Sequence, residues 1–201
     1  MAMLIKYSPK PAKNDNVLVN LIERKDLPRT TNIIEKIEPY LNDKEKIIDI
    51  GAGNCTVSNK LIKMGYNVLP VDIKDLSIYS NLRPVIYNGS KLPFEESSFD
   101  VSLLITTLHH TNNPEQLLKE AVRVSKKLVI MEDTYKNTIQ KYLTYLMDNF
   151  TNHQFLGLPH TNKSEEEWED LFYNLGLKVK AKYTHNFWKF FTSTTYYLKK
   201  M

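Results

Sequence analysis

The sequence predicts a three-layer α/β domain, in which helices cover both faces of a mainly parallel, seven-stranded sheet. Short apolar segments alternate with amphipathic segments along most of the chain, as expected for parallel strands joined by helices. The 201 residues suffice for one hydrophobic core but would be cramped for two domains. The last two β-rich segments, 177–186 and 192–199, follow each other without a helix, which predicts an antiparallel hairpin at one edge of the sheet.

The expected elements can be placed by periodicity and by the residues at their ends. Apolar residues at helical spacing predict helices at 16–24 and 31–41. From there to residue 131 strands and helices alternate: strand 47–50, helix 54–64, strands 67–72, 84–88 and 100–106, a helix capped by Asn113, and strand 127–131. Periodicity predicts a further helix at 138–150, and the pair Ser164 and Glu167 predicts a capping box at the start of the last helix.

The composition narrows the classes of protein to consider. Cys55 is the only cysteine, which excludes an internal disulfide framework and a zinc site built on cysteines. The N-terminal apolar stretch is too short for a secretory signal, so we expect a cytoplasmic location. No apolar run approaches the roughly 20 residues of a membrane helix. The net charge of +4 comes without a block of basic residues, which permits a nucleic-acid partner without indicating one and leaves the oligomeric state open.

A glycine turn lies between the first predicted strand and the helix that follows it. Gly51 permits a tight turn, and Gly53 lets a ligand approach the backbone closely. The next helix adds free N–H groups and a partial positive field at its N-terminus. Asp72 ends the second strand, where a carboxylate accepts hydrogen bonds from a ribose diol. Because ligands bind at the carboxyl ends of strands in open α/β sheets, this arrangement predicts a site for a ribose-containing ligand.

Four short segments occur in a distinctive order and spacing between residues 46 and 133. They are Asp49–Gly53, Val71–Asp72, Leu92–Phe94 followed by Ser98–Asp100, and Leu108–His110. Each is degenerate alone, but in this order they resemble class I S-adenosylmethionine-dependent methyltransferases, of the type that acts on small molecules and lipids. The resemblance implies a Rossmann-like fold, S-adenosyl-L-methionine as the cofactor, and methyl transfer to a small-molecule acceptor.

The resemblance also assigns residues to the cofactor. Asp49 would bind the amino group of the methionine part, Asp72 the ribose hydroxyls, and Thr106 would lie near the reactive methyl group. Asn88 stands where an acidic residue usually binds the adenine amino group, and its side-chain oxygen can still accept that hydrogen bond. The full set implied to line the cofactor is Asp49, Gly51, Ala52, Gly53, Asp72, Ile73, Asn88, Gly89 and Thr106.

Candidate catalytic residues follow the fourth strand. Of His109 and His110, at most one should face the acceptor, and we favour His110; it would act as a general base if the acceptor is a hydroxyl or a carbon acid. Either histidine could instead only close the pocket or cap the next helix. Residues proposed to line the acceptor site are Tyr142, Tyr145, Phe150 and His153. No trio of histidine and acidic residues has metal-ligand spacing, so no metal is expected.

The expected organisation is a single domain, 1–201, in four consecutive parts. Residues 1–44 would form a helical cap, 46–133 the cofactor-binding core, 134–163 a substrate lid, and 164–201 the last helix and the edge hairpin.

Three other functions share some of these features. A nicotinamide-dependent oxidoreductase would use the same glycine turn, but Thr56 replaces its third glycine and no room remains for a substrate domain. A non-catalytic binding protein could keep the fold and the cofactor. An RNA or protein methyltransferase is permitted by the mild basic charge, although an Asn-Pro-Pro-Tyr-like signature is absent after the fourth strand.

Overall fold

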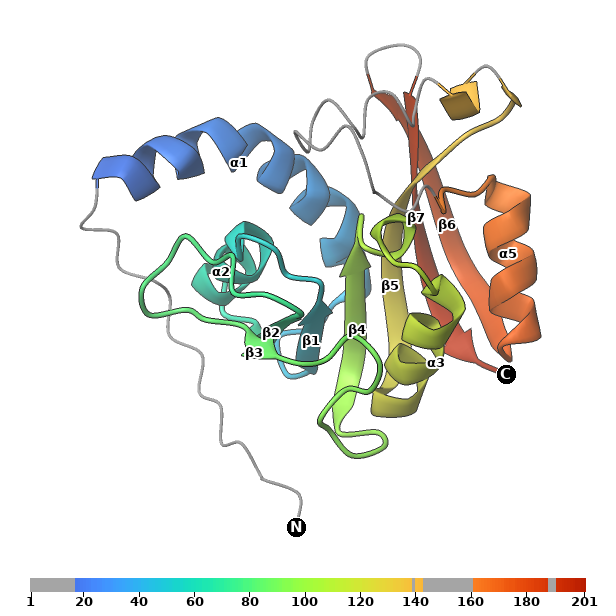
Figure 1. The fold of residues 1–201 in the computed structure, drawn as a ribbon, viewed down its shortest axis with the longest axis horizontal. Coiled ribbons are helices and arrows are strands. Elements are labelled where there is room, and N and C mark those ends of the chain that lie inside the picture. The colour runs from blue at the N-terminus through green and yellow to red at the C-terminus, as the bar shows by residue number, and fades with distance from the viewer. Residues whose placement is uncertain (1–16, 139, 143–160, 188–190) are drawn as a thin grey trace.

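The computed structural model describes residues 17–138, 140–142, 161–187 and 191–201. Its helices and strands alternate as the sequence predicts (Figure 1). The helices are α1 Val17–Ile37, η1 Glu38–Tyr40, α2 Thr56–Lys63, η2 Leu108–His110, α3 Pro114–Val124 and α5 Glu165–Asn174. The strands are β1 Lys46–Ile50, β2 Asn67–Asp72, β3 Val85–Ile86, β4 Phe99–Ile105, β5 Ser125–Thr134, β6 Leu177–Phe187 and β7 Phe191–Lys200.

The strands form one seven-stranded sheet in the order β3-β2-β1-β4-β5-β7-β6. The first five of these are parallel, while β7 runs antiparallel to both β5 and β6. The mainly parallel sheet and its antiparallel edge hairpin are therefore confirmed. The chain winds from β1 towards β3 and then returns to place β4 on the other side of β1. Such a switch point opens a crevice at the carboxyl ends of β1 and β4.

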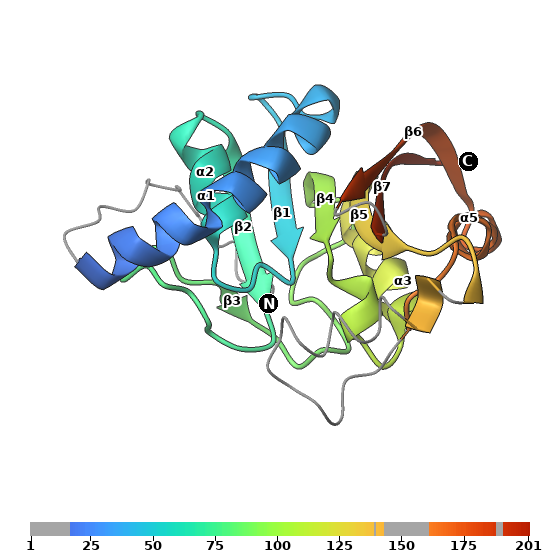
Figure 2. The same ribbon diagram turned by 90° about the horizontal axis from the view of Figure 1, so that it is seen from above.

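Helices cover both faces of the sheet (Figure 2), and the buried residues form a separate hydrophobic core on each face. On one face, α1 and α2 pack on the sheet through residues such as Ile37 and Leu61, both fully buried. On the other face, α3 and α5 bury Leu118, Trp168 and Phe172. These are the apolar positions that recur at helical spacing, so the amphipathic pattern of each helix decides which side meets the sheet.

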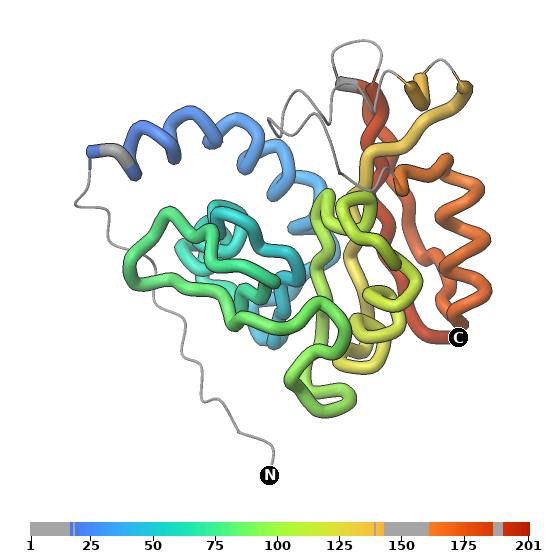
Figure 3. The backbone as a smooth tube through the Cα atoms, viewed as in Figure 1, coloured from blue at the N-terminus to red at the C-terminus, as the bar shows by residue number. Residues whose placement is uncertain are grey.

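The N-terminal helix differs from the prediction. Two helices were expected at 16–24 and 31–41, but α1 runs continuously from Val17 to Ile37 with Pro28 inside it. Pro28 lies on the exposed side, where the backbone can bend away from the missing hydrogen bond. Figure 3 shows that α1 follows an arc over the sheet. After Ile37 the chain tightens into η1, where Pro39 follows Glu38.

Local signals at helix ends predict where α3 and α5 begin, whereas the strand expected at 84–88 is shorter, Val85–Ile86. The Asn113 side chain accepts the N–H of Gln116 at the start of α3, and Ser164 and Glu167 form the complete capping box of α5. The strand expected at 127–131 begins earlier, because β5 starts at Ser125 directly after α3. Most of the helix expected at 138–150 lies outside the described residues.

Strand β6 is an edge of the sheet. Its pairing with β7 is interrupted by a register shift between Val179 and Ala181. Lys178 and Lys180 on this strand are exposed.

Candidate functional site

A cavity of about 510 Å³ opens at the carboxyl ends of β1, β2 and β4, where the winding order predicts a ligand site. Most of the lining comes from the ends of these three strands and the loops after them, and α1, α2, α3 and the segment after β3 contribute the rest. The lining residues are Arg29, Asp49, Gly51, Ala52, Gly53, Asn54, Thr56, Val57, Asp72, Ile73, Leu76, Tyr87, Ile105, Thr106, Thr107, His110, Thr111 and Leu117.

The two glycines of the turn have different roles. Gly51 has a φ of +79°, and a Cβ placed there would lie 2.3 Å from Cγ2 and 2.7 Å from Oγ1 of Thr107. It therefore allows the loop after β1 to pack directly against the loop after β4. Gly53 also has a positive φ, of +53°, but a Cβ there would have no atom within 4 Å. Since Gly53 lines the cavity, the space in front of its backbone is open to a ligand.

Cys55, which directly precedes α2, also adopts a left-handed conformation, with φ +63°. Its side chain is fully buried, and burial raises the pKa of the thiol to about 12. The thiol therefore stays protonated, and Cys55 packs in the core without taking part in chemistry.

Asp49 is the most deeply placed ionisable group of the cavity. Its side chain is 2% exposed and accepts a hydrogen bond from the Ser58 hydroxyl. Burial raises the pKa of Asp49 to about 6, against the opposing effect of the Ser58 bond, and the nearby Asp72 carboxylate adds to the rise. In the described part of the chain no lysine, arginine or histidine forms an ion pair with Asp49. A buried carboxylate without a cation favours a positively charged ligand.

Asp72 joins the loop after β1 to the loop after β2 by hydrogen bonds. One carboxylate oxygen accepts the Gly53 N–H at 2.8 Å, and the other accepts the N–H groups of Ile73 at 2.7 Å and Lys74 at 3.2 Å. The side chain is 9% exposed and faces the cavity. A carboxylate offers about four acceptor positions, so capacity for a ligand hydroxyl remains.

The segment after β4 forms the opposite wall. Thr106 has a φ of +50°, which is costly for a β-branched residue, and it lines the cavity as predicted. His110 also lines the cavity and is half-buried. His109 does not, since its ring is 2% exposed and its Nδ1 contacts the carboxylate of Glu132 on β5. Of the two predicted histidines, only His110 can reach a ligand.

Several lining residues had no signal in the sequence. Arg29 comes from the polar face of α1 and donates to the Thr106 hydroxyl at 3.1 Å. It is the one lysine or arginine in the cavity lining that the structure describes. Tyr87 follows β3 and lines the cavity, whereas the sequence predicts its neighbour Asn88 there. An arginine on a helix surface gives no local hint that the helix crosses a ligand cavity.

Other predicted site residues lie elsewhere. Asn88 and Gly89 are exposed and outside the cavity lining, and the Asn88 side-chain oxygen accepts the N–H groups of Ser90 and Lys91. Tyr142 is 66% exposed and also outside the lining. The predicted acceptor-site residues Tyr145, Phe150 and His153 fall outside the described residues. The roles assigned to these residues stay predictions.

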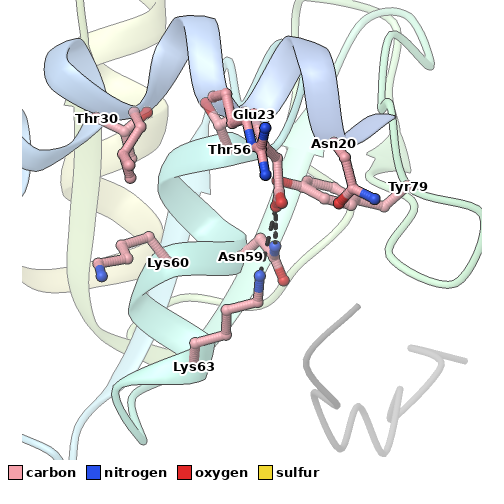
Figure 4. Close-up of a pocket in the computed structure, with 10 residues that line it drawn as sticks. Asn20, Glu23, Thr30, Thr56, Asn59, Lys60, Lys63 and Tyr79 are labelled. Atoms are coloured by element: carbon pink, nitrogen blue, oxygen red, sulfur yellow. Dashed lines mark hydrogen bonds and ion pairs between the residues drawn. The ribbon is translucent and has the colours of Figure 1, made fainter. Parts of the chain in front are cut away.

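A second cavity, of about 260 Å³, lies between α1 and α2 (Figure 4). Glu23 of α1 reaches across it and accepts hydrogen bonds from the Tyr79 hydroxyl at 2.5 Å and the Asn59 amide at 3.1 Å, with Lys63 at 3.4 Å. Asn59 is 1% exposed. Beyond Glu23, Asp26 accepts from the Asn54 amide in the glycine turn. Polar contacts therefore hold the first half of α1 over both cavities.

We expect Glu23→Ala to loosen this half of α1. The buried Asn59 amide and the Tyr79 hydroxyl would lose their acceptor, which costs roughly 1–3 kcal/mol, whereas the exposed Lys63 pair adds little. Hydrogen exchange of the α1 amides should become faster before Pro28 and remain slow around Ile34. Glu35→Ala, at an exposed position of the same helix, is the control. Unchanged exchange in the Glu23 variant would contradict this role.

No group of three or more histidine, cysteine, aspartate or glutamate residues is arranged to bind a metal ion in the described part of the chain. None of the helices described is both long and apolar enough to cross a membrane.

Known proteins resemble the part of the chain that builds the cavity. Residues 48–130 match a family model described as a methyltransferase domain. The ubiquinone biosynthesis O-methyltransferase of Rickettsia bellii is 26% identical over 127 residues, covering 57% of this chain and 53% of that protein. The demethylmenaquinone methyltransferase of Renibacterium salmoninarum is 30% identical over 115 residues, covering 51% and 48%. The chain therefore spans about half the length of these relatives.

The similarity in fold extends over nearly the whole chain. The structure of an S-adenosylmethionine-dependent methyltransferase from Thermotoga maritima aligns with a TM-score of 0.65 at 20% identity. The alignment covers 91% of this chain and 97% of that one. Residues 48–130 therefore resemble the methyltransferase domain family, within a chain that has the fold of S-adenosylmethionine-dependent methyltransferases.

Proposed function

We propose that this protein transfers a methyl group from S-adenosylmethionine to a small-molecule acceptor. The observation that carries the proposal is Asp49, a buried carboxylate without a described cationic partner beside an open glycine turn. S-adenosylmethionine carries an ammonium and a sulfonium group, both of which a carboxylate attracts. A dinucleotide would instead bring its anionic pyrophosphate to the turn, next to Asp49, where the two charges repel.

The other polar residues of the cavity fit the same cofactor. Asp72 has capacity left to accept from a ribose hydroxyl, and the backbone at Gly53 is open for close approach. Arg29 uses one donor for Thr106, and its other donors, which have no partner among the described residues, could bind the carboxylate of the methionine part. Two acidic groups and one guanidinium therefore complement the charges of a zwitterionic sulfonium ligand.

The acceptor would bind on the side of Thr106 and His110. When bound, S-adenosylmethionine supplies a methyl group already activated by its sulfonium. The chain must then orient the acceptor atom in line with that group, a contribution that can reach about 7–11 kcal/mol. His110 can take the proton from an acceptor hydroxyl or carbon acid. The Thr161 hydroxyl donates to the carbonyls of Leu108 and Thr111, which brings Thr161 to this wall.

Quinone-type molecules are the acceptors we propose to test first, because both relatives reported above are named for steps in quinone biosynthesis. Polyhydroxylated aromatic rings, such as catechols and naphthoquinols, are suitable probes. We also infer a cytoplasmic location, for which the reduced state expected of the single Cys55 is the support.

Calorimetric titration of the protein with S-adenosylmethionine and, separately, with NAD tests the cofactor. We expect S-adenosylmethionine alone to bind. Asp72→Ala removes the ribose acceptor and frees the Gly53 amide, so affinity should fall about 10- to 100-fold, the worth of hydrogen bonds to a charged group. Asp75→Ala is the matched control, because this nearby carboxylate pairs with Arg83 outside the cavity lining and its loss should leave affinity unchanged.

The outcomes separate the competing functions. Absence of S-adenosylmethionine binding would overturn the proposal, and binding of NAD would favour an oxidoreductase. Binding of S-adenosylmethionine without methyl transfer to any acceptor tested would favour a non-catalytic binding protein.

A further inference from the structure

Glu132, near the end of β5, is a fully buried carboxylate outside the cavity lining. The last residue pair of the β4–β5 ladder is Ile105 with Met131, so Glu132 lies just beyond the carboxyl end of β4. On its other side it pairs with Thr194 of β7. A carboxylate at this depth costs several kcal/mol unless its oxygens are satisfied.

The two oxygens of Glu132 have separate partners, all in the segment after β4. Oε1 accepts the backbone N–H of Thr107 at 2.9 Å and that of Leu108 at 2.7 Å. Oε2 contacts Nδ1 of His109. One side chain therefore binds three successive residues of the wall that faces the acceptor. In the described part of the chain, His109 is the one basic side chain that pairs with Glu132.

This segment needs such support because its backbone is strained. Thr106 has a left-handed φ of +50°, which is unfavourable for a β-branched residue. The bonds from Glu132 to Thr107 and Leu108 hold the chain immediately after the strained residue. The conformation that brings Thr106 and His110 to the cavity is thus held by a buried carboxylate that lies outside the cavity lining.

His109 connects Glu132 to the cavity. Its ring centroid lies 3.9 Å from that of His110, with the ring planes tilted by 50°. An ionised Glu132 accepts only a proton-bearing nitrogen, so it places a proton on Nδ1 of His109 and fixes the orientation of the ring. The orientation of His109 in turn limits where the His110 ring can lie.

We propose that Glu132 and His109 form a buried positioning pair that sets the placement of His110 on the acceptor side of the cavity. His110 would touch the acceptor, while Glu132 and His109 act only through it. The assignment of His110 rests on the proposed function, whereas the pair itself does not.

Glu132→Gln is the sharpest test because it replaces one acceptor oxygen with an NH₂ donor and keeps the size of the side chain. The amide oxygen can still accept the N–H groups of Thr107 and Leu108, but the amide NH₂ would now face Nδ1 of His109. The proton of neutral His109 should then move from Nδ1 to Nε2. Long-range ¹⁵N–¹H NMR of the imidazole rings distinguishes these two tautomers, and a merely structural role would not change them.

We expect Nδ1 of His109 to carry a proton in the wild type and to lose it in Glu132→Gln. The ring resonances of His110 should shift with this change, while the Thr107 and Leu108 amides stay protected from exchange. Glu132→Asp keeps the charge and should retain the Nδ1 proton. Ser193→Ala is the matched control, because the Ser193 hydroxyl bonds only the backbone carbonyl of Glu132 and its loss should leave both histidines unchanged.

Two results would overturn the proposal: a wild-type His109 without a proton on Nδ1, or unchanged His110 resonances in Glu132→Gln. Calorimetry on the same samples keeps this test separate from the cofactor. Affinity for S-adenosylmethionine should change less than about 3-fold in Glu132→Gln, since the carboxylate lies outside the cavity and the backbone bonds persist. A wild type that shows the Nδ1 proton but binds no S-adenosylmethionine would refute the proposed function and leave the pair standing.

Discussion

Replacing Gly51 with alanine should both destabilise the protein and abolish binding of S-adenosylmethionine. The new Cβ would overlap the Thr107 side chain, whose Cγ2 lies 2.3 Å away, and the φ of +79° disfavours any L side chain. Overpacking and backbone strain together predict a loss of roughly 3 kcal/mol in the free energy of unfolding. Urea denaturation measures this loss, and calorimetry with S-adenosylmethionine measures the effect on binding.

Gly53→Ala is the matched control, two residues along the same turn. A Cβ at Gly53 meets no atom of the protein within 4 Å, so only the cost of a left-handed φ applies, about 1 kcal/mol. Its methyl group would occupy the space where the ligand approaches, and we expect binding to be lost while the fold is kept. Equal stability of the two variants would contradict the role given to the Gly51–Thr107 contact.

Asp49→Asn should make the protein more stable at neutral pH while it abolishes cofactor binding. The asparagine oxygen can still accept the Ser58 hydroxyl, but no charge is buried. The pKa of Asp49 rises from 3.8 to about 6 on folding, and each unit corresponds to about 1.36 kcal/mol, so the ionised carboxylate destabilises the native state by about 3 kcal/mol. Urea denaturation at pH 7.5 should show a gain of this order. Calorimetry should show that Asp49→Asn no longer binds S-adenosylmethionine.

The raised pKa of Asp49 also fixes the sign of the pH dependence of stability. Between pH 4 and 6 the native state holds the Asp49 proton and the unfolded state releases it, so the contribution of this group to stability falls as pH rises through that window. The stability difference between Asp49→Asn and the wild type should therefore be small at pH 4, grow to pH 6 and stay constant above. Affinity of the wild type for S-adenosylmethionine should follow the opposite course, because only ionised Asp49 attracts its ammonium group. A difference in stability that did not vary with pH would refute this account.

Local patterns predict most of this fold. The buried runs at β1 and β4, the Asn113 cap and the Ser164 capping box are all set by residues close in sequence, and the structure contains each of them. The prediction of two helices was wrong at Pro28, because proline usually ends a helix but α1 continues through it. There the core contacts of Ile33, Ile34 and Ile37, together with the polar bridges from Glu23 and Asp26, hold one continuous helix. Tertiary contacts of this kind leave no local signature.

Some residues of the site could likewise be predicted from local patterns and others could not. Asp49, the glycine turn and Asp72 are set by strand ends, so their spacing predicts their meeting in one cavity. Arg29 reaches that cavity from a helix far away in sequence, and no local feature indicates it. Glu132 did leave a trace, because a carboxylate that directly follows the buried run Leu128–Met131 must find partners inside the fold. The sequence does not identify those partners, because they come from the loop after another strand.

The lysines and the register shift on β6 oppose strand pairing between copies of this chain in concentrated solution. An edge strand offers unpaired N–H and C=O groups to which a strand from another molecule can add. The irregularity between Val179 and Ala181 breaks the straight template, and Lys178 and Lys180 would bring like charges together if two such edges approached. A long C-terminal hairpin leaves an open edge, and these two features reduce the tendency of that edge to aggregate. Replacing both lysines with valine would turn the end of the sheet into a nucleus for intermolecular strand pairing.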